Sequence, residues 1–169
     1  MQEKPIHYFM IESEIERIFG NKLRLRVSGI CVRDNQILLI KHANLGEGGY
    51  LWSPPGGGLH FGESVEMCLK REFEEETGFT IAMKRFLFVN EFLQPPLHAI
   101  ELFFEVEIAG GALLLGKDPE MQENSQIIKE IAFLDTKTLQ KEPSVCVHNM
   151  FRGLKNISEL FQKNGYFRG

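Results

Sequence analysis

Hydrophobic and polar positions along the chain follow two different periods, which predict a mixture of strands and helices. Two largely apolar runs, residues 25–32 and 36–41, are joined by the turn residues 33–35, a pattern typical of a hairpin of two buried strands. Further strands are predicted at residues 86–89, 100–108 and 130–134. The strands therefore occupy most of the chain's middle, with helical segments around them.

Apolar residues at helical spacing predict three helices, at about residues 9–19, at 63–77 and at about 144–163. Residues 44–62 are predicted to be a loop, because they hold seven of the chain's sixteen glycines. No internal repeat or linker interrupts this order. The pattern predicts a single α/β domain over residues 1–169.

Composition excludes several classes of protein. The chain has 169 residues, of which 43% are hydrophobic and 25% charged, which is typical of a globular protein. No apolar run is long enough for a transmembrane helix, and four glutamates in the first sixteen residues argue against a signal peptide. Three widely spaced cysteines fit a reducing compartment. We therefore expect a cytoplasmic protein that does not bind membranes.

The negative charge is concentrated in one segment. The net charge is −4, and residues 63–76 alone contain six glutamates against Lys70 and Arg71, which also gives −4. The rest of the chain is therefore balanced. No basic face for the backbone of duplex nucleic acid is visible, so no such partner is expected.

Three of these glutamates share one face of the predicted helix. Glu72, Glu75 and Glu76 stand at positions i, i+3 and i+4, in the last turn, where the helix dipole disfavours each anion by about 0.3–1 kcal/mol. Repulsion between Glu72 and Glu76 adds about 0.2–0.5 kcal/mol. Val65 and Leu69 precede them on the same stripe. The face therefore begins as core and ends as a carboxylate cluster.

Two interpretations of this cluster compete. A glutamate-rich segment is commonly a solvated helix face. Here, however, the carboxylates oppose the dipole and continue an apolar stripe, and a divalent cation would relieve both conflicts. Mg²⁺ or Mn²⁺ prefers carboxylate oxygens. The glycines at 56–58, just before the helix, would let a phosphate approach backbone N–H groups. The pattern favours a site for a metal and a polyphosphate.

The same residues resemble a known signature. The match is to the signature box of Nudix hydrolases, a family that includes MutT-like and ADP-ribose pyrophosphatase-like enzymes. Every constrained position of the box agrees: Gly57, then Glu63 after five residues, then after seven more the run from Arg71 to Phe79. The box occupies residues 57–79. The resemblance implies a Nudix-type α/β/α sandwich with a mixed β-sheet.

The resemblance also implies roles for the acidic and basic residues of the box. Glu72, Glu75 and Glu76 would bind Mg²⁺ or Mn²⁺, and one glutamate would assist the attacking water. Arg71 would orient a box carboxylate by charge-assisted hydrogen bonding. Glu63 would either hold the loop against the helix or bind a further metal ion.

Substrate contacts are expected from residues around the box. Gly57 and Gly58 would shape the loop around a diphosphate. Lys41 and His42 either reach a phosphate or are ordinary residues at the end of a strand. The loop at 110–126 offers two candidates for an additional carboxylate or solvated acids, Glu120 and Glu123.

The implied activity is metal-dependent hydrolysis of a phosphoanhydride bond in a nucleoside diphosphate linked to another moiety. ADP-ribose, a nucleotide sugar or a nucleoside triphosphate would fit. Pro95, sixteen residues past the box, resembles the ADP-ribose-cleaving subgroup. The alternative is a non-catalytic Nudix-fold module that binds nucleotides or regulates a partner. The family leaves a homodimer open.

Overall fold

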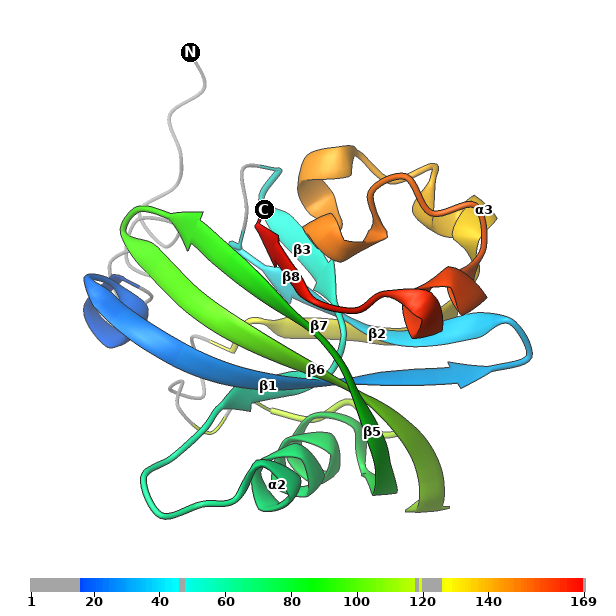
Figure 1. Cartoon of the computed structure of the whole chain (residues 1–169), viewed down its shortest axis with the longest axis horizontal. Coiled ribbons are helices and arrows are strands. Elements are labelled where there is room, and N and C mark those ends of the chain that lie inside the picture. Colours follow the sequence, from blue (N-terminus) through cyan, green and yellow to red (C-terminus); the bar gives the residue numbers. More distant parts are fainter. Residues whose placement is uncertain (1–15, 46–47, 118, 120–125, 169) are drawn as a thin grey trace.

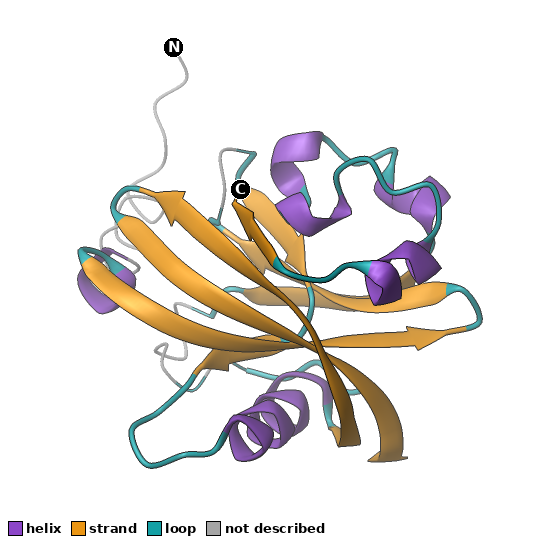
Figure 2. Cartoon of the chain, in the orientation of Figure 1, coloured by secondary structure: helices purple, strands orange, loops and turns teal. Residues whose placement is uncertain are grey.

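An eight-stranded mixed sheet organises the molecule (Figures 1 and 2). The computed structural model describes residues 16–45, 48–117, 119 and 126–168. The elements that position the site are β1 (Lys22–Arg33), β2 (Gln36–Ala43), β3 (Tyr50–Ser53), β4 (Gly56–Gly58), α2 (Val65–Thr77), β5 (Phe79–Gln94), β6 (Leu97–Gly111) and β7 (Ile128–Leu134). They are followed by α3 (Thr136–Leu139), three 3-10 helices and β8 (Tyr166–Arg168).

The strand order is β3-β2-β1-β6-β5-β8, with β4 also paired to β1 and β7 to β2. The β1–β6 and β5–β8 pairs are parallel and the others antiparallel. Helix α2 covers one face, and short helices of the C-terminal region lie on the other (Figure 1). The predicted α/β fold with a mixed sheet is confirmed.

Each layer buries its own hydrophobic core. Leu69 and Phe73 of α2 pack with Val27 and Val106 of the sheet, and all four are almost fully buried. On the opposite face, Ile157 and its neighbours in the C-terminal region pack on the other set of strand side chains. Successive residues of a strand point to opposite faces, so one sheet can supply both cores.

Helix α2 forms almost where the sequence predicts it. The Ser64 hydroxyl accepts a hydrogen bond from the Met67 N–H at 3.2 Å, which caps the first turn. Gly78 ends the helix, and its N–H donates to the Glu74 carbonyl. The helix begins two residues later than predicted, because residue 64 is a cap and not part of the helix.

The predicted loop at residues 44–62 is wrong in part, because it contains β3 and β4. β3 pairs with β2, and the glycines of β4 pair with β1. Glycine is unfavourable in strands, so this segment carries no strand signal. A Cβ on Gly57 would lie 2.1 Å from Glu72 Oε1, which explains why this position of β4 is glycine.

The predicted helix at about 144–163 is also wrong. This region forms 3-10 helices at Ser144–Cys146, Asn149–Phe151 and Ile157–Gln162. Gly153 has φ 75°, which a right-handed helix cannot contain, and it separates the second from the third. The apolar residues are buried as predicted, but short turns present them to the sheet.

Of the predicted helix at about 9–19, residues 16–19 are helical, and the rest lies outside the described residues. The three cysteines are free and buried, which agrees with their odd number. Among the described residues, no helix is long and apolar enough to cross a membrane.

Candidate active site

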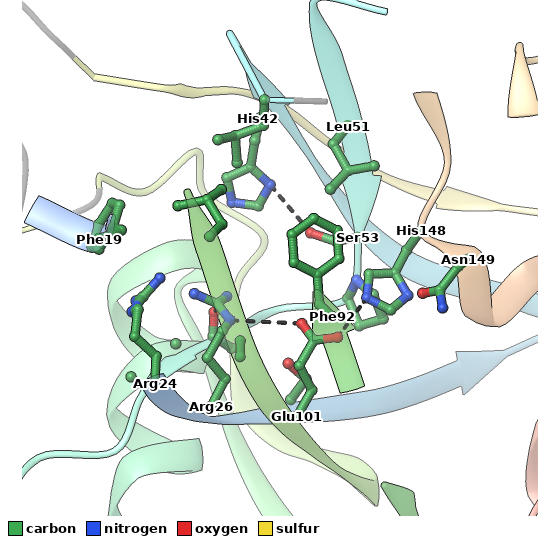
Figure 3. Close-up of a pocket in the computed structure, with 18 of the residues that line it drawn as sticks. Phe19, Arg24, Arg26, His42, Leu51, Ser53, Phe92, Glu101, His148 and Asn149 are labelled. Carbon is green, nitrogen blue, oxygen red and sulfur yellow. Dashed lines mark hydrogen bonds and ion pairs between the residues drawn. The ribbon is translucent and has the colours of Figure 1, made fainter. Parts of the chain in front are cut away.

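A cavity of about 400 Å³ lies where β4 and the first strands meet α2 and the C-terminal region. Side chains of β1, β2, β3, α2, β5, β6 and residues 144–152 line it (Figure 3). Segments far apart in the sequence thus share one concave surface, a common setting for a ligand site.

Two carboxylates of α2 are buried in the wall of this cavity. Glu72 is 7% exposed and Glu76 is 5% exposed. The Gly56 N–H donates to Glu76 Oε2 at 2.9 Å. Burial, followed by the charge of Glu76, raises the pKa of Glu72 to about 7. Glu72 and Glu76 are therefore two acidic groups held close together, and the surrounding protein does not fully compensate their negative charge.

Arg71 ties the residues of the signature box together. Its Nε donates to Glu63 Oε1 at 2.8 Å, and its Nη1 donates to Glu72 Oε1 at 2.7 Å and to Glu75 Oε2 at 3.1 Å. Its Nη2 also donates to the Gly58 carbonyl at 3.3 Å. One guanidinium thus links the loop, the helix and the glycine strand.

These hydrogen bonds give Glu63 a pKa shift opposite to that of Glu72. The hydrogen bonds from Arg71 lower the pKa of Glu63 to about 2, although burial opposes them. Glu63 in turn is the main reason that the pKa of Arg71 is raised. Of the two roles expected for Glu63, these contacts favour holding the loop against the helix.

The donor set around α2 fits a divalent cation in part. Among the described residues, no three His, Cys, Asp or Glu side chains are close enough to form a ready metal cluster. Glu72 and Glu76 are oxygen donors of the type that Mg²⁺ prefers. Burial and then the charge of Glu76 raise the pKa of Glu72, and a cation would oppose both effects. Glu75 is bound to Arg71 and its side chain is one third exposed. The residues fit a cation held by Glu72 and Glu76, with Glu75 adjacent.

The predicted substrate residues separate into two groups. Gly57, Gly58 and His42 line the cavity. His42 Nε2 lies 3.8 Å from Glu76 Oε1, and its Nδ1 is hydrogen-bonded to the Ser53 hydroxyl at 3.3 Å (Figure 3). His42 is therefore placed between strand β2 and the carboxylates of α2.

Lys41 points elsewhere. It is not among the residues that line the cavity. Its ammonium lies 4.4 Å from the centre of the Tyr50 ring and 3.8 Å from Glu130 Oε2. Adjacent residues of a strand face opposite sides, so Lys41 and His42 cannot both reach the site. Of the two alternatives for Lys41, the geometry favours an ordinary strand residue.

The two loop carboxylates, Glu120 and Glu123, lie outside the described residues. Pro119, which precedes them, lines the cavity. Their expected roles stay predictions.

The structure also brings a polar group into the cavity that the sequence does not reveal. Glu101 of β6 is 7% exposed, and its Oε2 accepts hydrogen bonds from Asn90 Nδ2 at 2.8 Å and from His148 Nε2 at 2.9 Å. His148 Nδ1 accepts from the Met150 N–H at 3.2 Å, which leaves the proton on Nε2. Arg26 Nε lies 3.8 Å from Glu101 Oε1.

Glu101 stays ionised despite its burial. Burial alone would raise the pKa of this carboxyl, but the interactions with His148, Arg26 and Asn90 together outweigh it and lower the pKa. The same strand also carries Glu105 and Glu107, so a glutamate in it does not by itself mark Glu101. No pattern in the sequence could have indicated its partner, 47 residues away.

Known proteins resemble this chain in sequence and in structure. A family model described as NUDIX domain matches residues 22–144. An ADP-ribose pyrophosphatase of Methanocaldococcus jannaschii is 37% identical over 117 residues, which is 68% of this chain and 63% of that relative. A mitochondrial ADP-ribose pyrophosphatase of Rattus norvegicus is 44% identical over 57 residues, 34% of this chain and 15% of that relative. The chain spans less than two thirds of the length of either relative.

Solved structures share the fold. A NUDIX hydrolase from Nitrosomonas europaea matches with a TM-score of 0.66 and 16% identity, over 83% of this chain and 89% of that one. A MutT NUDIX hydrolase from Burkholderia pseudomallei matches with a TM-score of 0.60 and 26% identity, over 78% of this chain and 94% of that one. The first likeness concerns the fold alone.

Proposed function

We infer the function of this chain from its family: it belongs to the NUDIX family, whose domain model matches residues 22–144. This membership confirms the resemblance predicted from residues 57–79. The relatives support the prediction of a pyrophosphohydrolase. We propose that the chain hydrolyses a phosphoanhydride bond of a nucleoside diphosphate derivative, and that ADP-ribose is the first candidate, because both sequence relatives are named for it.

One observation carries the proposal. Glu72 and Glu76 are buried side by side, next to a strand of glycines, with the pKa of Glu72 raised by burial and by its neighbour. Such an arrangement is costly in a structure that has no cation to bind, and it is expected at a functional site. The open backbone of β4 offers close approach to a diphosphate.

In this proposal Glu72 and Glu76 hold Mg²⁺ or Mn²⁺, with Glu75 as a further donor or as the group that takes a proton from the attacking water. When bound there, the ion would supply positive charge that stabilises the transition state of phosphoryl transfer. Arg71 positions Glu72 and Glu75 through its hydrogen bonds. Gly57 leaves room for the Glu72 carboxylate, and His42 approaches Glu76 from β2.

A substrate panel tests the proposal. The chain is incubated with ADP-ribose, nucleotide sugars, dinucleoside polyphosphates and nucleoside triphosphates, each with Mg²⁺, with Mn²⁺ and with EDTA. We expect hydrolysis that EDTA abolishes, with AMP among the products from ADP-ribose. Binding of these nucleotides without turnover would contradict the proposal and support the non-catalytic module. The cytoplasmic location and the homodimer stay predictions.

A further inference from the structure

A row of paired residues crosses the sheet from the glycine strand β4 to β5. Arg26 of β1 is paired with Gly58 of β4 on one side and with Glu101 of β6 on the other, and Glu101 is paired with Asn90 of β5. Neighbouring strands lie about 4.8 Å apart, so Glu101 stands about 10 Å from the glycine strand. That span is similar to the reach from a diphosphate to the sugar or base attached to it.

Among the described residues, one oxygen of the Glu101 carboxylate accepts hydrogen bonds and the other accepts none. Its Oε2 accepts from Asn90 and His148, which fixes the orientation of the group. Its Oε1 receives no hydrogen bond from the described residues; it is ion-paired with the guanidinium of Arg26 at 3.8 Å, which is longer than a hydrogen bond. Glu101 lines the cavity, and Figure 3 shows it beneath the Phe92 ring. An acceptor with fixed orientation therefore faces the space where a ligand would lie.

An ionised carboxylate only accepts hydrogen bonds, so it matches a hydroxyl or amino group and repels a phosphate. Leu51, Phe92 and Phe103 supply apolar lining in the same cavity, which Arg24 and Arg152 also line. A mostly apolar pocket with a few fixed polar groups is typical of a site that recognises one small molecule.

We propose that Glu101 is a specificity-determining residue, whose Oε1 accepts a hydrogen bond from a hydroxyl or amino group of the moiety attached to the diphosphate. This inference rests on the proposed function. In this inference the part of the cavity around Glu101 recognises the attached moiety, whereas the residues of α2 act on the diphosphate. His148 and Asn90 are positioning residues, because they act through Glu101.

The proposal is tested with analogues of ADP-ribose, each of which lacks one hydrogen-bond donor. Hydrolysis of ADP-ribose is compared with that of IDP-ribose, which has an oxo group in place of the adenine amino group, and with deoxy analogues of each ribose. The wild-type chain should lose roughly 10- to 100-fold in kcat/KM with the analogue that lacks the recognised donor. The analogue affected tells whether the donor is the base amine or a sugar hydroxyl.

The variant Glu101→Gln should remove this discrimination. His148 and Asn90 hold the amide oxygen, so the amide nitrogen, a donor, faces the cavity. We expect KM for ADP-ribose to rise roughly 10- to 100-fold, kcat to change by less than about threefold, and the analogue ratio to approach one. Glu107→Gln, on the same strand with an exposed side chain, is the matched control and should change neither.

The outcomes separate the two proposals. If the wild-type chain hydrolyses no nucleoside diphosphate derivative, the proposed function fails. If it is active and Glu101→Gln keeps the wild-type analogue ratios, only the role of Glu101 is refuted. Should Glu101→Gln not fold, Glu101→Asp keeps the charge but withdraws the oxygen. Loss of discrimination with kcat retained then supports the proposal, and unchanged discrimination overturns it.

Discussion

Two buried acidic groups line the same cavity, and their electrostatics are opposite. Glu72 and Glu76 come from one helix and repel each other, and the pKa of Glu72 is raised to about 7. Glu101 is assembled from β6 with partners on β1, β5 and the C-terminal region, and its pKa is lowered. In the proposed function the first group needs a cation to balance its charge, whereas the charge of the second is already balanced by its protein partners. The difference indicates which carboxylates are available for chemistry and which is fixed for recognition.

The largest expected effect is on catalysis at the first group. Glu76→Gln should lower kcat/KM for the best substrate about 10³-fold, because charge stabilisation by a metal ion is worth several kcal/mol and each ~1.4 kcal/mol is a factor of ten. Steady-state kinetics with saturating Mg²⁺ measures the loss. Glu74→Gln makes the same chemical change on the exposed side of α2 and is the control. Activity that survives in Glu76→Gln would show that the metal ligands are assigned wrongly.

The second expected effect is on stability at the other group. His148→Ala removes the main partner of a carboxylate that stays buried, so the free energy of unfolding should fall by about 3 kcal/mol. Urea denaturation measures the change. His60→Ala, at an exposed histidine, serves for comparison and should cost less than about 0.5 kcal/mol. Equal losses in both variants would show that Glu101 does not depend on His148.

The pH dependence of stability should distinguish the groups further. Glu72 has an ordinary pKa of 4.5 and a folded-state pKa of about 7, so its protonated form is favoured by folding. Its contribution is full below pH 4.5 and is lost as the pH rises through 7. In EDTA, the wild-type chain should therefore lose about 1–3 kcal/mol between pH 5 and pH 8 relative to Glu72→Gln. Mg²⁺ at pH 8 should restore part of this loss, and an identical pH profile in the two proteins would contradict it.

The smallest expected effect compares two neighbours on β2. Lys41→Ala should change KM by less than about twofold, because its ammonium lies over the Tyr50 ring, outside the cavity. His42→Ala should raise KM several-fold, since its ring lies beside Glu76. Kinetics of both variants with one substrate settles the comparison. A larger effect from Lys41 would place substrate on the other face of β2.

Much of the site could be predicted because its residues are close together in the sequence. Spacing on one helix puts Glu72 and Glu76 on one face wherever the helix packs, and the cap residues Ser64 and Gly78 fix its ends. Strand alternation likewise puts Lys41 and His42 on opposite faces of β2. The glycine strand could not be predicted, because glycine carries no strand signal and β4 forms only through its pairing with β1.

The sequence by itself determined the helix with its carboxylates, the hairpin and the family, since each depends on local spacing or on a fixed motif. Tertiary structure alone decided that Glu101 meets His148, Asn90 and Arg26, because cross-strand register and the path of the C-terminal turns bring together residues far apart in the chain. It also decided the opposite pKa shifts of Glu72 and Glu101. Burial and the sign of the nearest charge set the pKa, and both quantities arise only when the chain folds.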